Sequence, residues 1–180
     1  MSETLTIRSV DAALVVVPMR RALGTSVMSI RQAPLVLIDL RTEEGIIGRA
    51  YLFCYLESAG HAAVALSRDV SAVLAGTAAS PAAIRRELEA HFRLLGVRGL
   101  VSAIVAGVDV ACWDALAIAA GLPLARMLGG TMRPTAAYNS NGLGLLEPQA
   151  AADEALELVA VGFRAIKMRL GRPSGHDDLA

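Results

Sequence analysis

The last part of the chain, from residue 131, contains a strand, a helix and a second strand joined by short connections. Residues 135–140 and 163–170 are short apolar segments typical of strands, and residues 148–161 have helical spacing. A crossover helix between two strands places them parallel, since antiparallel strands can be joined by a tight turn. The pattern therefore predicts a βαβ unit, the beginning of an α/β domain.

The residues before this unit follow a different pattern. Apolar segments at residues 6–17, 34–40 and 46–55 predict three antiparallel strands, and Gly45 supplies the positive φ of the turn between the last two. Helical spacing then predicts four helices, at residues 57–74, 81–95, 99–120 and 122–128. The fold class expected is an α+β domain, with a three-stranded antiparallel sheet and a helical bundle, followed by the first βαβ unit.

Residues 19–33 have no steady period and are expected to form a mobile loop. Its apolar members are unusual for a solvated loop; they are Leu23, Val27, Met28 and Ile30. Two interpretations remain open. These side chains pack on their own domain, or the loop is a flap that closes over a ligand.

Charge and hydropathy narrow the class of protein. The formal net charge is +0, so no long-range field favours nucleic acid or an anionic membrane. Residues 100–120 are long enough to span a membrane, but Asp109 and Asp114 would each cost roughly 2.5–3.5 kcal/mol near the bilayer centre. We therefore expect a buried helix of a globular domain.

Two further features indicate the cytoplasm. Cys54 and Cys112 lack CxxC spacing and are expected to be buried free thiols, which fits a reducing compartment. The amino terminus has no basic stretch before an apolar core, so no signal peptide is expected.

Lys167 and Arg169 are the candidate functional pair. In a strand they would point to one face, while Ile166, Met168 and Leu170 would point to the other. Two cations on an otherwise apolar strand need an anion opposite them, because an unpaired buried charge is costly. That anion is either a carboxylate of the protein, which would make the pair structural, or a carboxylate of a substrate.

Three segments resemble the mandelate racemase branch of the enolase superfamily. They are residues 33–40 (APLVLIDL), 106–116 (AGVDVACWDAL) and 162–169 (GFRAIKMR). The middle segment departs from the family pattern at Ile118, just after it, where a basic residue is usual. The resemblance implies a capping domain over residues 1–130 and the start of a modified (β/α)₈ barrel over residues 131–180.

The resemblance also implies a chemistry. Family members remove the proton next to a carboxylate, and Mg²⁺ stabilises the resulting enediolate. Lys167 and Arg169 match a Lys-x-Lys pair of the family, in which the second lysine is the base on one face of the substrate. Arginine stays protonated and is a poor base. The match therefore favours a reaction that needs a base on one face only, such as acid-sugar dehydration, over racemisation, which needs a base on each face. The substrate-binding residues implied are Leu23, Val27, Ile30, Tyr55 and Ser140.

The metal ligands of the family would lie beyond Ala180, so no metal ligand is expected within this chain. Two barrel strands cannot close an eight-stranded barrel. The chain is therefore expected to be part of a longer enzyme, a dehydratase or racemase that forms homo-oligomers when full-length, and to be inactive alone. The alternative is a non-catalytic α+β module that binds a small carboxylate or mediates dimerisation.

Overall fold

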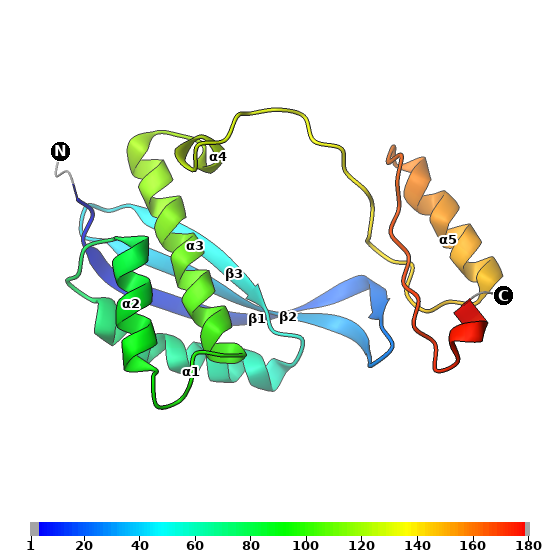
Figure 1. The fold of residues 1–180 in the computed structure, drawn as a ribbon, viewed down its shortest axis with the longest axis horizontal. Helices are drawn as coiled ribbons and strands as arrows, with labels where there is room; N and C mark the ends of the chain where they lie inside the picture. The colour runs from blue at the N-terminus through cyan, green and yellow to red at the C-terminus, as the bar shows by residue number, and fades with distance from the viewer. Residues whose placement is uncertain (1–3, 179–180) are drawn as a thin grey trace. The chain divides into compact units, whose positions relative to one another are not determined.

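The computed structural model describes residues 4–178 and divides them into two compact units. The first unit comprises the chain up to Val16 together with Pro34–Met132, and the second comprises Val17–Ala33 together with the residues from Arg133 onwards. The helices and strands, shown in Figure 1, are β1 (Ile7–Gly24), β2 (Ser29–Thr42), β3 (Ile47–Phe53), α1 (Glu57–Leu74), α2 (Pro81–His91), α3 (Leu100–Ala120), α4 (Leu124–Met127), α5 (Pro148–Ala160) and the 3₁₀ turn η1 (Gly175–Asp178).

The three strands form one sheet in the order β1-β2-β3. Strands β2 and β3 pair antiparallel, with Leu37 opposite Tyr51. The turn between them closes through the Thr42 N–H, which donates to the Ile46 carbonyl at 2.9 Å, and Gly45 has a φ of +83°. The three-stranded antiparallel sheet predicted from the sequence is confirmed.

The predicted loop at residues 19–33 is wrong. β1 continues through Pro18 to Gly24, and β2 begins at Ser29, so these residues form the end of a long hairpin. The Thr25 N–H donates to the Met28 carbonyl at 2.9 Å and closes the hairpin. The sequence lacks alternation here, but ladder hydrogen bonds with the neighbouring strand satisfy the backbone and keep the segment extended.

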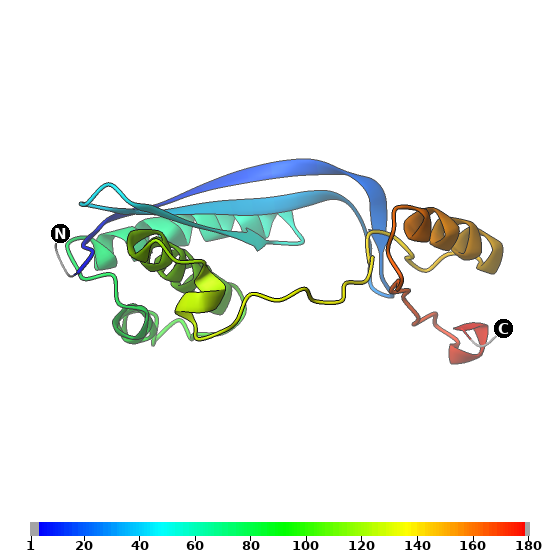
Figure 2. The same cartoon turned by 90° about the horizontal axis from the view of Figure 1, so that it is seen from above.

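Helices α1, α2 and α3 cover one face of the sheet in the first unit (Figure 2). α1 buries Gly60, Ala63, Ser67, Val70 and Leu74, a spacing of three or four residues that forms one helical stripe. The core between helices and sheet includes Ile7, Val36, Ile38, Leu40 and Val108, each at most 1% exposed. Burial of these aliphatic side chains is the main favourable term in folding this unit.

α3 approaches the sheet closely through small residues. A Cβ at Gly48 would collide with the carbonyl oxygen of Ala111 and lie 2.7 Å from the Ala115 nitrogen. The Asp114 carboxylate accepts a hydrogen bond from the Arg49 backbone N–H at 2.9 Å. Among residues 4–178, α3 is the one helix long and apolar enough to cross a membrane by length and composition, and here it packs against β3.

Helix boundaries follow the predictions within two residues, except at the end of α2. Pro81 occupies the first turn of α2, and the Ser80 side chain makes no capping hydrogen bond. α2 ends at His91, not near residue 95, because the chain turns there and Gly96 adopts a φ of +89°.

The two predicted barrel strands are not formed as strands. Residues 135–140 and 163–170 pair through a single parallel bridge, between Asn139 and Ile166. The prediction of two regular strands is therefore wrong for the described residues, although the parallel direction is right. A barrel strand is stabilised by neighbours on both sides, whereas the part of the chain that the structure describes places no further strand beside these two segments.

Candidate functional site

The parallel bridge brings the two candidate segments of the second unit together. The Asn139 N–H donates to the Ala165 carbonyl at 2.9 Å, and the Lys167 N–H donates to the Asn139 carbonyl at 2.9 Å. Ser140 is the next residue along and is exposed. Backbone pairing thus places Ser140 beside the segment that carries Lys167.

Lys167 and Arg169 have different surroundings. Lys167 is exposed, and its ammonium has no hydrogen-bond or ion-pair partner among the described side chains of residues 4–176. The Arg169 side chain is half-buried and donates from Nη1 to the Gly142 carbonyl at 2.8 Å. One of the five N–H donors of Arg169 is therefore engaged by backbone, and the others are available to an anion.

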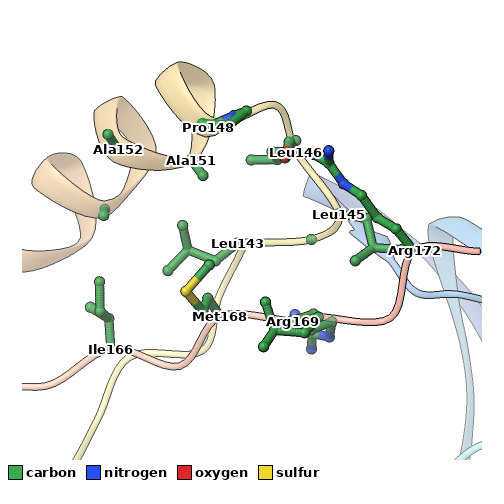
Figure 3. A pocket seen from close by; sticks show the side chains of 13 residues that line it. Leu143, Leu145, Leu146, Pro148, Ala151, Ala152, Ile166, Met168, Arg169 and Arg172 are labelled. Atoms are coloured by element: carbon green, nitrogen blue, oxygen red, sulfur yellow. Dashed lines mark hydrogen bonds between the residues drawn. The ribbon is translucent and has the colours of Figure 1, made fainter. Parts of the chain in front are cut away.

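A cavity of about 350 Å³ lies between α5 and residues 166–172. Figure 3 shows the side chains of Leu143 and Ile166 directed toward the helix that carries Ala151 and Ala152. Arg169 lines this cavity together with Met168 and Leu170. The strict alternation predicted for a strand therefore does not hold for Arg169, because the segment is irregular.

The chemistry of this cavity suits an organic anion. Most of its lining is aliphatic, and the charges come from Arg169 and Arg172. Arg172 donates to the Leu146 carbonyl and also lies 3.4 Å from a Glu147 oxygen. A ligand with an apolar body could pack against the aliphatic lining of the cavity, and its carboxylate could accept hydrogen bonds from the guanidinium of Arg169.

The hairpin residues of the second unit line a neighbouring cavity of about 330 Å³, which shares residues 144–146 with the first. Its hairpin members are Arg21, Ala22, Gly24, Thr25 and Ser29. The three apolar residues expected at the substrate are placed differently: Leu23 is half-buried, Val27 is 88% exposed and Ile30 is 5% exposed.

Tyr55 belongs to the first unit, just after β3. It has a φ of +59°, a backbone conformation that is uncommon for a residue with a side chain. Its ring packs edge-on against Phe53, with ring centroids 4.6 Å apart, and its side chain is 58% exposed. The ring contact holds the aromatic side chain at the surface of this unit.

The two thiols are structural. Desolvation raises the pKa of Cys112 to about 12, with a further contribution from the charge of Asp109. Burial also raises the pKa of Cys54. Neither thiol is activated as a nucleophile, because a reactive cysteine needs a lowered pKa.

Among the side chains that the structure describes, those of residues 4–176, there is no cluster of three or more His, Cys, Asp or Glu able to hold a metal ion. His61 lies 3.6 Å from Glu57 on the surface of α1, and His91 packs edge-on against Phe92. Mg²⁺ prefers several oxygen ligands in octahedral geometry. The described residues therefore do not fit a magnesium site of their own.

Sequence reasoning missed one residue of this region, Glu154 on α5. Its carboxylate lies 2.8 Å from Arg21 Nε and accepts the Leu143 N–H at 2.8 Å. The glycines of the 141–144 segment, Asn-Gly-Leu-Gly, are the only signal in the sequence that backbone packs closely there.

Two solved structures are similar to this chain along almost its entire length. An enolase from alpha pretobacterium bal199 with bound Mg is 41% identical, with a TM-score of 0.91 over 97% of this chain and 49% of that chain. An enolase from Bradyrhizobium complexed with magnesium and mandelic acid is 41% identical, with a TM-score of 0.85 over 99% of this chain and 49% of that chain.

A curated relative and a family model agree with these structures. The 3,6-anhydro-alpha-L-galactonate cycloisomerase of Streptomyces coelicolor is 28% identical over 147 residues, which are 81% of this chain and 40% of the relative. The chain thus spans less than half the length of these three proteins. The model of the mandelate racemase / muconate lactonizing enzyme N-terminal domain matches residues 8–129, from β1 to the end of α4. The predicted resemblance is confirmed, and the chain belongs to the mandelate racemase / muconate lactonizing enzyme family of the enolase superfamily.

Proposed function

We propose that this chain forms part of an enolase-superfamily enzyme that removes the α-proton of a carboxylate substrate, as an acid-sugar dehydratase or a mandelate racemase-like enzyme. Relatives include dehydratases, epimerases and a cycloisomerase, which supports an enzyme of this general kind. The Bradyrhizobium enolase, which was crystallised with mandelic acid, supports an organic acid as the ligand.

The observation that carries this proposal is the exposed position of Lys167, the single lysine of the chain. The chain has 17 Lys and Arg residues, and Lys167 is the single lysine among them. Lysine can lose its proton when its pKa is lowered, whereas arginine remains charged. An exposed lysine that follows Ile166 of the bridge directly and has no partner among the described side chains is suited to bind a carboxylate.

The two cations have separate roles in this proposal. Lys167 attracts the substrate carboxylate, and Arg169 stabilises the negative charge that develops when the α-proton leaves. Arg169 is not the base, because its guanidinium stays protonated. Ser140, the residue after Asn139 of the bridge, is proposed to hydrogen-bond the bound acid. Leu23, Val27, Ile30 and Tyr55 remain substrate-binding predictions that rest on the family resemblance alone.

Mg²⁺ belongs to the proposal for the family and would polarise the substrate carboxylate. The similar enolases were crystallised with magnesium. Because the described side chains, up to residue 176, offer no cluster of ligands, no step is assigned to the metal within this chain. For the same reason, we propose that the 180-residue chain alone is inactive.

Three further properties belong to the same proposal. The domain boundary falls at residue 130, with a capping domain before it and barrel residues after it. The two free cysteines favour a reducing compartment such as the cytoplasm. Exposed Leu37 and Tyr51 on the sheet favour homo-oligomers of the full-length protein.

A single-lysine experiment tests the ligand. Reductive methylation with ¹³C-formaldehyde labels Lys167 and the terminal amine, so one lysine resonance reports the site. We expect mandelate to shift that resonance saturably and mandelamide, which lacks the charge, to leave it unchanged. Arg169→Gln should weaken mandelate binding about tenfold, because a charge-assisted hydrogen bond is lost.

The matched control is Arg164→Gln, which removes an exposed cation from the same segment. It should leave mandelate binding unchanged. Equal weakening by both variants would mean that general charge, and not a site at Lys167 and Arg169, attracts the acid. Saturable binding without Mg²⁺, together with a full-length product that has no activity, would favour the alternative of a non-catalytic carboxylate-binding module.

A further inference from the structure

Glu154 joins two segments of the second unit through its two carboxylate oxygens. Oε1 lies 2.8 Å from Arg21 Nε on the hairpin, and Oε2 accepts the Leu143 N–H at 2.8 Å. The Glu154 side chain is 18% exposed. A carboxylate so shielded is held strongly by charge-assisted hydrogen bonds, since little water competes for its oxygens.

The peptide group between Gly142 and Leu143 is held at both ends. Its N–H, from Leu143, donates to Glu154, and its carbonyl, from Gly142, accepts from Arg169 Nη1 at 2.8 Å. The N–H and the carbonyl of one planar peptide group point in opposite directions. Rotation of this group would therefore break the bond to Glu154 and remove the acceptor of Arg169 together.

Two glycines, one on either side of Leu143, let the backbone lie close to Glu154 and to the hairpin. Gly142 has a φ of +141°, and a Cβ there would lie 2.8 Å from Glu154 Oε1. Leu143 has a φ of +47° while its side chain is 2% exposed. A Cβ at Gly144 would lie 3.1 Å from the Cα of Gly24 on the hairpin. A left-handed leucine carries a backbone strain that persists only where surrounding contacts maintain it.

We propose that Glu154 is a positioning residue for Arg169. It fixes the orientation of the peptide group between Gly142 and Leu143, and that peptide group fixes the guanidinium. Through Arg21, the same carboxylate links the hairpin to the placement of Arg169. The functional importance of this link rests on the proposed role of Arg169 toward a substrate carboxylate, but the link itself can be measured without any substrate.

The experiment uses NMR of the full 180-residue chain and three substitutions. Glu154→Ala removes both bonds. Glu154→Gln keeps a side-chain oxygen that can accept the Leu143 N–H, but its amide cannot also accept from Arg21. Glu157→Ala is the matched control. Glu157 is on the same helix as Glu154, a carboxylate oxygen of Glu157 lies 2.6 Å from Arg21 Nη2, and its side chain is 67% exposed.

Two readouts report the link directly. The hydrogen-exchange rate of the Leu143 amide reports the bond to Glu154. Separate Nη resonances of Arg169 report a guanidinium whose rotation is slowed by the Gly142 carbonyl. Denaturant unfolding of each variant distinguishes a local change from a loss of global stability.

We expect Glu154→Ala to accelerate exchange of the Leu143 amide about fivefold or more and to merge the Arg169 Nη resonances. Glu154→Gln should retain the slow exchange of the Leu143 amide and the separate Arg169 Nη resonances of the wild type. Glu157→Ala should leave both readouts unchanged. If Glu154→Ala does not fold, Glu154→Asp decides, because its shorter side chain should also fail to hold the Leu143 N–H. Unchanged Leu143 exchange and Arg169 resonances in the Ala or Asp variant, or an equal effect of Glu157→Ala, would overturn the proposal.

Discussion

Burial in α3 alters the acid–base behaviour of Cys112. It is fully buried in α3, and desolvation raises the pKa of its thiol to about 12. The same thiol in an unfolded chain has a pKa of about 8.5. The folded state therefore favours the protonated thiol, so the stability that this contributes is complete below pH of about 8.5 and is lost as the pH rises toward the folded pKa.

We accordingly expect the free energy of unfolding to fall between about pH 8.5 and 12, partly through Cys112. Denaturant unfolding at several alkaline pH values measures this slope. Cys112→Ala should reduce the slope, whereas Cys54→Ala, at a less buried thiol, should change it less. A slope that is the same in wild type and Cys112→Ala would contradict the assignment.

Residues that depend on local geometry could be predicted from the sequence. The turn at Gly45 is predictable, because its positive φ follows from one residue and its neighbours. Glu154 could not be predicted in this way. Its partners Arg21 and Leu143 come from distant segments and meet only after the chain has folded.

At the level of elements, β3 and α3 of the first unit approach so closely that only a glycine fits between them at residue 48. Gly48 faces the backbone of Ala111 and the Ala115 nitrogen, so no side chain fits between strand and helix. Alternating apolar residues predicted β3, and the apolar run with two aspartates predicted α3 as a buried helix. The closeness of the two elements was not predictable, because no periodic pattern encodes the distance between backbones.

Gly48→Ala should lower the free energy of unfolding by about 3 kcal/mol, because the added methyl group forces the helix and strand apart. Chemical denaturation followed by circular dichroism measures this loss. Gly175→Ala is the control, since a Cβ there meets open space and the change should stay within about 0.5 kcal/mol. A Gly48→Ala variant as stable as Gly175→Ala would show that the strand and helix separate without cost.

The hairpin and the βαβ unit show where pattern reading fails for elements. The lack of a steady period over residues 19–33 predicts a loop, yet strand β1 continues to Gly24. The segments at 135–140 and 163–170 have the composition of strands, yet they form one bridge. In both cases pairing with neighbours, and not local sequence preference, determines whether a segment becomes a strand.

At the level of the whole molecule, the match over residues 8–129 shows the family, while the activity remains a proposal. The chain spans 49% of the two similar enolases and 40% of the cycloisomerase. The described side chains of residues 4–176 include the cations Lys167 and Arg169 but no cluster of metal-binding groups. The proposal therefore assigns carboxylate binding to Lys167 and Arg169 and requires further groups for proton removal.

Isotope exchange at the α-carbon tests the central claim most directly. Mandelate and galactarate would be incubated in D₂O with Mg²⁺ and either the 180-residue chain or the full-length gene product, and ¹H NMR would follow the α-proton. We predict that, with at least one of these acids, the full-length product replaces this proton by deuterium or releases a dehydrated product, and that the 180-residue chain does neither. Exchange by the 180-residue chain alone, or a full-length product inactive toward both acids, would contradict this account.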